Sequence, residues 1–185
     1  MKRRLLLLTA ALLAGCASTP PKPSGLPALR LAPALLGDAR WALSQRLSVW
    51  RLDAPAAPPQ RVDVQLQLDA SGLLLAGFAF SQRVLLMQWD GKDLQVQRHA
   101  MLPAEVDTDR MLRDLCLTFW PADAVRAALP DGWAWVATAD GQALQQAGEA
   151  RVLLRRPGAN IVEIVNLAEG YRLLIESLSA EASSS

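Results

Sequence analysis

The chain has 185 residues, with 19 basic and 18 acidic side chains, one histidine and two cysteines. This length fits one domain with a substantial hydrophobic core. A formal net charge of +1 gives no basic excess of the kind that binds nucleic acid. A single histidine and one internal cysteine cannot fill a zinc site, so we expect neither a metal nor another cofactor.

The first fifteen residues have the pattern of a secretory signal peptide. Residues 2–4 are Lys-Arg-Arg and residues 5–13 form an apolar run, which is shorter than the roughly 20 residues that span a bilayer. The sequence LAGC, which ends at Cys16, resembles the lipobox of bacterial lipoproteins. The resemblance implies cleavage before Cys16 and lipidation of its thiol. Because Ala17 rather than Asp follows, it also implies an outer-membrane location facing the periplasm. The alternative is an ordinary signal peptide with a coincidental cysteine.

Two terminal segments have the composition of unfolded chain. Residues 16–39 are rich in Pro, Ala and Leu, which predicts a tether between the lipidated Cys16 and a folded domain over residues 40–178. The serine-rich end, residues 179–185, is predicted to be a disordered tail.

Alternation of apolar and polar residues predicts antiparallel strands. It is clearest at residues 62–69, where Val and Leu alternate with Asp and Gln. Asp-Gly pairs at positions 90 and 140 predict tight turns. The expected strands cover residues 41–52, 62–69, 73–80, 83–89, 93–99, 133–138, 143–155, 160–167 and 171–178.

The helical signal is confined to the middle of the chain. Asp107 or Thr108 can cap a helix, and Pro121 ends or kinks it. A second short helix is expected from Pro121 to Leu129. Helices inserted between two sets of antiparallel strands predict an α+β domain. The apolar stripe of the first helix is formed by Leu112, Leu115, Cys116 and Phe119.

Strands 73–80 and 83–89 are apolar on both faces, although an antiparallel strand needs only one dry face. The helix pair 108–129 could cover one face. A second sheet layer, or an apolar ligand in a concave sheet, could cover the other. A filled core and a ligand cavity are equally compatible with this pattern. The candidate cavity residues are Phe78, Phe80, Met87, Trp89, Leu112, Leu115, Phe119 and Trp120.

The stretch LRDLCLTFWP (112–121), followed by Val125 and Leu129-Pro130, resembles the lid region of the LolA/LolB class of lipoprotein carriers and receptors. This resemblance implies a LolB-like fold, in which a curved antiparallel sheet forms an open half-barrel and helices cover its concave apolar face.

More narrowly, the motif RDLxLxFWP (113–121), preceded by HAMLPAEV (99–106), resembles the DUF3261 family of bacterial outer-membrane lipoproteins over residues 40–178. Cys116 departs from the pattern, since a polar residue such as Gln is expected there. Members of the family are often encoded in aryl-polyene-type clusters beside acyl carrier and acyltransferase genes. The resemblance therefore implies an acyl-chain cavity and work at the outer membrane.

The sequence gives little support for an enzyme. A Ser-His-Asp site would have to use His99, and no Gly-x-Ser-x-Gly elbow is present. Asp114 lies mid-helix in the most family-like stretch. Its ordinary interpretation is a salt bridge with Arg110 on a solvated face.

The resulting hypothesis is a non-enzymatic lipoprotein that is anchored in outer-membrane lipid through Cys16. It would bind an acyl chain or lipoprotein cargo and assist transport or insertion, with an aryl-polyene-type lipid as one candidate. One alternative is a lipid-anchored scaffold with a filled core that binds an envelope protein. Another is an accessory enzyme of acyl transfer or thioester hydrolysis.

Overall fold

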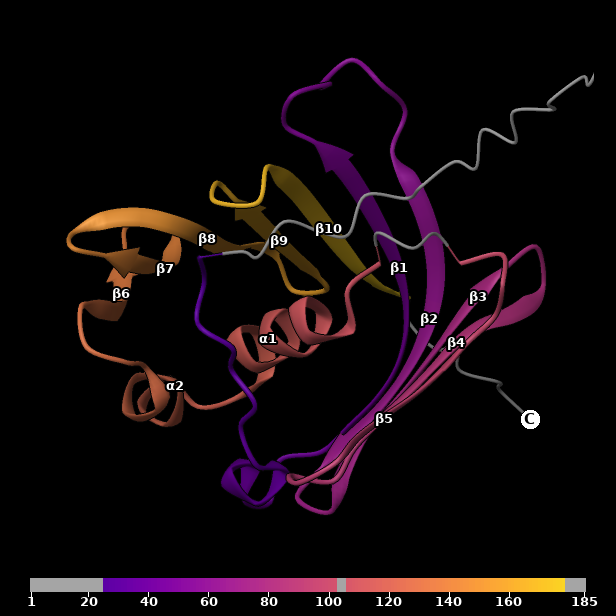
Figure 1. Cartoon of the computed structure of the whole chain (residues 1–185), viewed down its shortest axis with the longest axis horizontal. Coiled ribbons are helices and arrows are strands. Elements are labelled where there is room, and N and C mark those ends of the chain that lie inside the picture. The colour runs from indigo at the N-terminus through magenta and orange to yellow at the C-terminus, as the bar shows by residue number, and fades with distance from the viewer. Residues whose placement is uncertain (1–24, 103–105, 179–185) are drawn as a thin grey trace, which may run out of the picture.

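The protein is an α+β domain in which one curved antiparallel sheet wraps around a helix (Figure 1). The computed structural model describes residues 25–102 and 106–178. Cys16, the signal peptide and the predicted tail 179–185 lie outside the described residues. The first half of the sheet contains β1 (Trp41–Arg51), β2 (Gln60–Asp69), β3 (Gly72–Ala79), β4 (Gln82–Trp89) and β5 (Leu94–Arg98). The second half contains β6 (Trp133–Thr138), β7 (Gly141–Gln146), β8 (Glu149–Gly158), β9 (Ile161–Asn166) and β10 (Tyr171–Leu178).

The sheet is an open one of ten strands, in the order β5-β4-β3-β2-β1-β10-β9-β8-β7-β6. Each half is a run of hairpins between consecutive strands. The halves meet where β1 pairs with β10, with Leu47 opposite Ile175. The sheet is therefore two antiparallel meanders joined through β1 and β10, the first and last strands of the described residues.

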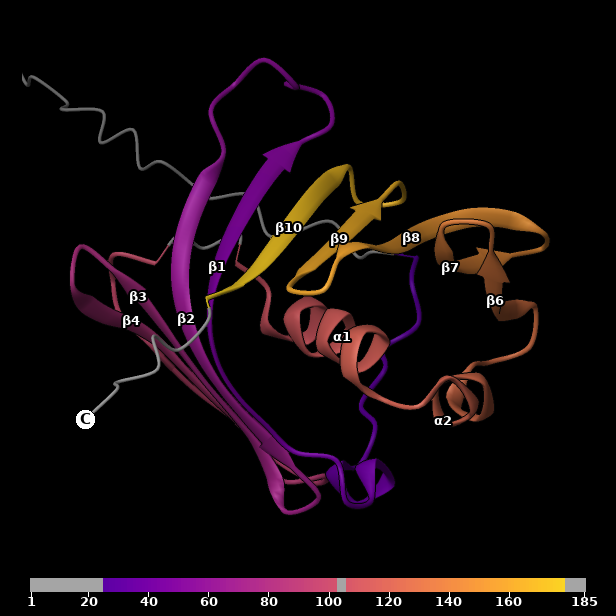
Figure 2. The ribbon, with the colours of Figure 1, turned by 180° about the vertical axis from the view of Figure 1, so that it is seen from behind.

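Helix α1 (Thr108–Phe119) lies inside the curve of the sheet, and α2 (Ala122–Ala128) follows it beside β6 (Figures 1 and 2). The Asp107 side chain accepts hydrogen bonds from the backbone N–H groups of Asp109 and Arg110, at 2.9 and 3.2 Å. The predicted cap is confirmed, and it satisfies donors that the first helical turn leaves open.

Period-2 alternation explains the concave face of the sheet. Leu66 on β2, Leu75 on β3 and Met87 on β4 lie side by side in register and are buried. Residues one position along each strand point outward, where Leu74 and Phe78 remain partly exposed. The expected cover for this second apolar face is therefore incomplete in the part of the chain described.

Left-handed turns explain two of the differences between the predicted and observed strand boundaries. The expected strand 143–155 is split into β7 and β8 by a turn at Ala147 and Gly148, whose φ angles are 49° and 84°. Phe80 is not part of β3: it forms a two-residue turn with Ser81, with φ angles of 50° and 61°. Positive φ is rare for residues other than glycine, so the Phe80–Ser81 turn has no clear sequence signal.

The predicted tether ends too late. Residues 25–36, which we call the strap, pack into the core and include a short 3-10 helix, η1 (Pro33–Leu36). The strap runs past α1 to the end of the sheet where η1 contacts β2 and β3 (Figure 1). Its prolines and alanines resemble a linker, but four of its five leucines reach inward. The buried leucines of the strap are Leu26, Leu29, Leu31 and Leu36.

Candidate functional site

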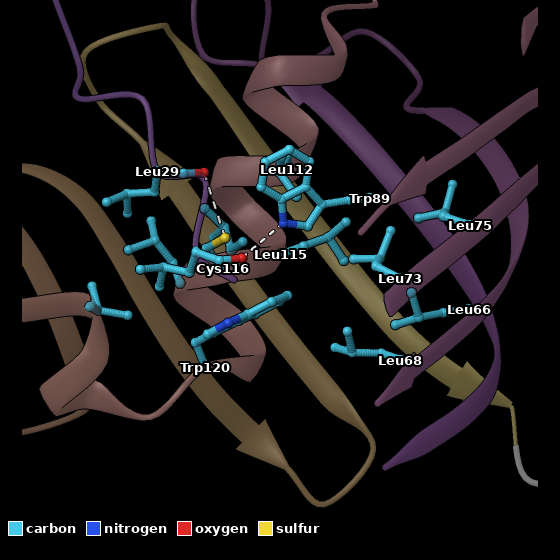
Figure 3. Close-up of a cluster of buried hydrophobic side chains, with 14 of the residues drawn as sticks. Leu29, Leu66, Leu68, Leu73, Leu75, Trp89, Leu112, Leu115, Cys116 and Trp120 are labelled. Atoms are coloured by element: carbon cyan, nitrogen blue, oxygen red, sulfur yellow. Dashed lines mark hydrogen bonds between the residues drawn. The ribbon is translucent and has the colours of Figure 1, made fainter. Parts of the chain in front are cut away.

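The candidate site is the apolar trough between the concave sheet and α1 (Figure 3). Six of the eight predicted cavity residues belong to the same hydrophobic core here. Five of the six are buried, and Phe119 is partly exposed. These six are Met87 and Trp89 from β4, Leu112, Leu115 and Phe119 from α1, and Trp120 directly after it.

Phe78 and Phe80 do not belong to this trough. Phe78 is paired with Asp63 on β2, on the outer face of the sheet. Phe80 is 89% exposed at the tip of the β3–β4 hairpin. Their prediction as cavity residues was wrong, because Phe78 has the strand parity opposite to Leu73 and Leu75, and Phe80 lies beyond the end of the strand.

The strap closes the trough and is held there mainly by apolar contacts. Arg30 points outward and pairs with Asp109 on α1 at 2.5 Å, in an exposed position. At the far end, Gly91 approaches Pro33 so closely that a Cβ atom on Gly91 would lie 3.2 Å from the Pro33 Cδ atom. Because four strap leucines belong to the buried core, the chain itself fills the interior of the trough.

Side chains of the trough also bind the strap backbone. The Trp89 Nε1–H donates to the Leu31 carbonyl at 2.8 Å, and the Trp120 Nε1–H donates to the Ala32 carbonyl at 3.0 Å. The Cys116 thiol donates to the Leu29 carbonyl at 3.5 Å (Figure 3). These bonds give the Leu29 and Leu31 carbonyls partners in an apolar interior, and the Ala32 carbonyl also accepts from the Leu35 backbone N–H at 3.1 Å.

Cys116 is a buried free thiol on the strap side of α1. Burial raises its pKa to about 12, so the sulfur stays protonated at neutral pH. A protonated thiol is a weak hydrogen-bond donor, and Cys116 uses it to donate to the Leu29 carbonyl of the strap.

A buried polar cluster holds the first half of α1 against the turn between β9 and β10. Arg113 donates to both carboxylate oxygens of Glu169, at 3.0 and 2.7 Å. Arg110 reaches the same carboxylate at 2.9 Å, and the Tyr171 hydroxyl donates to Asp114. We call this group the Arg113 cluster; it contains Arg110, Arg113, Asp114, Asn166, Glu169 and Tyr171.

The Arg113 cluster corrects the expectation of a solvated Asp114. Asp114 is only 6% exposed, and Arg110 pairs with Glu169 instead of Asp114. Burial raises the pKa of Asp114 to about 6, although the Arg113 charge acts in the opposite direction. Burial also raises the pKa of Tyr171 well above its ordinary value. Sequence reasoning missed Asn166, Glu169 and Tyr171, because nothing local links them to a helix more than 50 positions earlier.

Other candidate sites are less developed. A hollow of about 310 Å³ lies near the β2–β3 turn and is lined mainly by polar side chains such as Gln67 and Gln88. The His99 side chain is exposed and accepts a hydrogen bond from the Met101 backbone N–H at 3.2 Å. Across the described ranges, no group of three or more His, Cys, Asp or Glu side chains is arranged to hold a metal. In the same ranges, no helix combines the length and apolarity needed to cross a membrane.

Comparison with known protein families gives one match. A family model described as "Protein of unknown function (DUF3261)" matches residues 42–179. No curated protein matches the chain. The family match includes the whole sheet beyond Trp41, both helices and the Arg113 cluster, and it begins after the strap. The predicted family is confirmed: the chain belongs to the DUF3261 family.

Proposed function

We propose that the protein is an outer-membrane-anchored periplasmic lipoprotein that binds an acyl chain in its trough and assists lipid transport or insertion, as a LolB-like carrier would. The observation that carries the proposal is the trough itself. An unclosed sheet presents a continuous apolar concave face, and part of its cover is an extended strap rather than a regular element.

Exchange of the strap for an acyl chain is physically reasonable. Each buried methylene contributes about 0.8 kcal/mol, so a long acyl chain can replace the contacts of the strap leucines. Apolar contacts are not directional, and one apolar occupant can therefore replace another at small net cost. The trough supplies the matching surface, with Met87 and Leu112 fully buried in it.

Phe80 supports contact with an apolar partner outside the trough. An aromatic side chain that is 89% exposed at a hairpin tip can enter a lipid surface. Its positive φ also costs stability, which fits a position kept for function. Phe80 would then act at the membrane during delivery, without lining the cavity.

The lipid anchor has a direct test. We expect an alkyne palmitate analogue fed to expressing cells to label the wild-type protein and the Cys116→Ser variant equally. The Cys16→Ser variant should not be labelled. Labelling that persists in Cys16→Ser would contradict the anchor.

Ligand binding is tested with the chain from residue 17 onward, which contains every described residue. Native mass spectrometry after extraction from a bacterial envelope should show discrete lipid adducts, and the bound species should be released with organic solvent. Substituting Leu112 by Asp in the trough should abolish the adducts, whereas Leu74→Asp on the outer face should not. An adduct-free wild-type protein that also fails to bind a fluorescent fatty acid would contradict carrier function.

A second function is favoured by a different observation. The trough is filled by α1 and the strap, which is the arrangement expected of a lipid-anchored scaffold with a complete core. A scaffold would bind an envelope protein through its outer surface and would not take up lipid, so the same mass measurement separates the two functions.

A further inference from the structure

The hydrogen bonds to the strap indicate which kind of ligand could take its place in the trough. Two indole N–H groups and one thiol are directed at carbonyl oxygens within strap residues 29–32. Both indoles are nearly inaccessible, with Trp89 3% and Trp120 5% exposed. An indole N–H can only donate, so each needs an acceptor for as long as it is buried.

Loss of the strap would leave these donors without partners. A buried donor that loses its acceptor is penalised by the full cost of its desolvation. A bare hydrocarbon chain brings no acceptor and cannot make up that loss. An acyl chain in ester or amide linkage carries a carbonyl oxygen next to its apolar part, which is the combination that the strap presents with its leucines and carbonyls.

The first part of the strap lacks strand pairing with the sheet. Residues 25–32 belong to no strand, so no ladder of backbone hydrogen bonds fixes them to the sheet. Helix α1 has attachments of its own: the Arg113 cluster at its start, and a hydrogen bond from Arg156 on β8 to the Thr118 carbonyl at 2.6 Å. These attachments of α1 do not involve the strap, so separation of the strap would leave them intact.

We propose that the strap is a displaceable occupant of the acyl site, and that the ligand is an acyl ester or amide whose carbonyl oxygens replace those of Leu31 and Ala32 as acceptors for Trp89 and Trp120. The inference rests on the proposed acyl-binding function and specifies the class of ligand. Displacement also frees up to about 40 Å of extended chain on the side of Cys16, so uptake of ligand lengthens the link to the anchor.

The test compares two probes that differ only in their carbonyls: dihexanoyl phosphatidylcholine and its dihexyl ether analogue, both below their micelle concentrations. Binding is measured by native mass spectrometry, and strap release by hydrogen exchange of residues 25–36. The proteins are the chain from residue 17 onward and its Trp89→Phe and Trp120→Phe variants. The control is Trp50→Phe, since the Trp50 ring lies against the Arg172 guanidinium on β10.

We expect the ester to bind about tenfold or more tightly than the ether and to abolish exchange protection in the strap. Each of the two trough variants should reduce the ester-to-ether ratio by about three- to tenfold, and Trp50→Phe should leave it unchanged. If a variant does not fold, the ester-to-ether binding ratio of the unsubstituted chain still tests carbonyl recognition.

Other outcomes separate the two proposals. Equal binding of ester and ether overturns carbonyl recognition but leaves acyl binding intact. Ester binding with a strap that remains protected overturns displacement. If neither probe binds, the proposed function itself fails. A free peptide of strap sequence that releases the strap, where the lipids do not, would make the trough a peptide site and overturn the ester proposal.

Discussion

Helix α1 is held on one side by the Arg113 cluster and on another by the strap, and the two attachments use opposite chemistry. The cluster joins charged and hydroxyl groups through directional bonds, so its geometry admits one arrangement. The strap relies on leucines and a few bonds to its backbone. A helix fixed by directional bonds can keep its position while a less directional cover is exchanged, as the proposed carrier function requires.

The largest effect is expected from breaking the cluster. Arg113→Ala leaves Glu169 buried without its bidentate partner, and we expect the free energy of unfolding to fall by about 3–5 kcal/mol. Urea unfolding measures this loss. The control is Arg30→Ala, which removes an exposed ion pair and should cost less than about 1 kcal/mol. Equal losses in both variants would contradict a specific role for the cluster.

The strap should give the next largest effect. Leu29 is 1% exposed, and Leu29→Ala should lower the free energy of unfolding by about 2–4 kcal/mol and accelerate hydrogen exchange in residues 25–36. Leu35 lies in the same segment but is half exposed, so Leu35→Ala should change stability by less than about 0.5 kcal/mol. If Leu29→Ala also proves neutral in urea unfolding, the strap is not part of the core.

The cluster should respond to pH in a way that the strap does not. Because burial raises the pKa of Asp114 to about 6, the folded protein keeps a proton that the unfolded chain loses near pH 4. The free energy of unfolding should therefore fall as pH rises from about 4 to about 6, on the order of 2 kcal/mol for this group. The difference in stability between wild type and Asp114→Asn isolates this group. A difference that is flat across this range, or that has the opposite sign, would contradict the assignment.

The smallest change in stability is expected from the β3–β4 hairpin, which belongs to neither the Arg113 cluster nor the strap. Positive φ at Phe80 and Ser81 is the geometry of a type I′ turn, which favours Asn-Gly. The double substitution Phe80→Asn and Ser81→Gly should raise the free energy of unfolding by about 1 kcal/mol, as measured by thermal unfolding. The proposed membrane role adds an expectation of weaker binding to phospholipid vesicles. A loss of stability would show that Phe80 makes contacts that the exposed position does not suggest.

The sequence predicted elements that have a local cause. Alternation of apolar and polar residues predicted β2, and the Asp107 cap predicted the start of α1. The apolar stripe from Leu112 to Phe119 predicted which face of α1 enters the trough. The strap was missed because its prolines and alanines suggest a linker, and its buried leucines follow neither a helical nor a strand period. The Arg113 cluster was missed because its two halves are far apart in the chain, and no local pattern joins Asp114 to Tyr171.

The pairing of the first and last strands has a consequence for how the chain folds. Each meander can form from contacts between neighbours in sequence, but the join between β1 and β10 brings together residues as distant as Ser44 and Leu178. In a protein whose other strand pairs are local, we expect closure of so long a loop to be the slow step. We therefore expect two early hairpin arrays that merge when β1 and β10 pair.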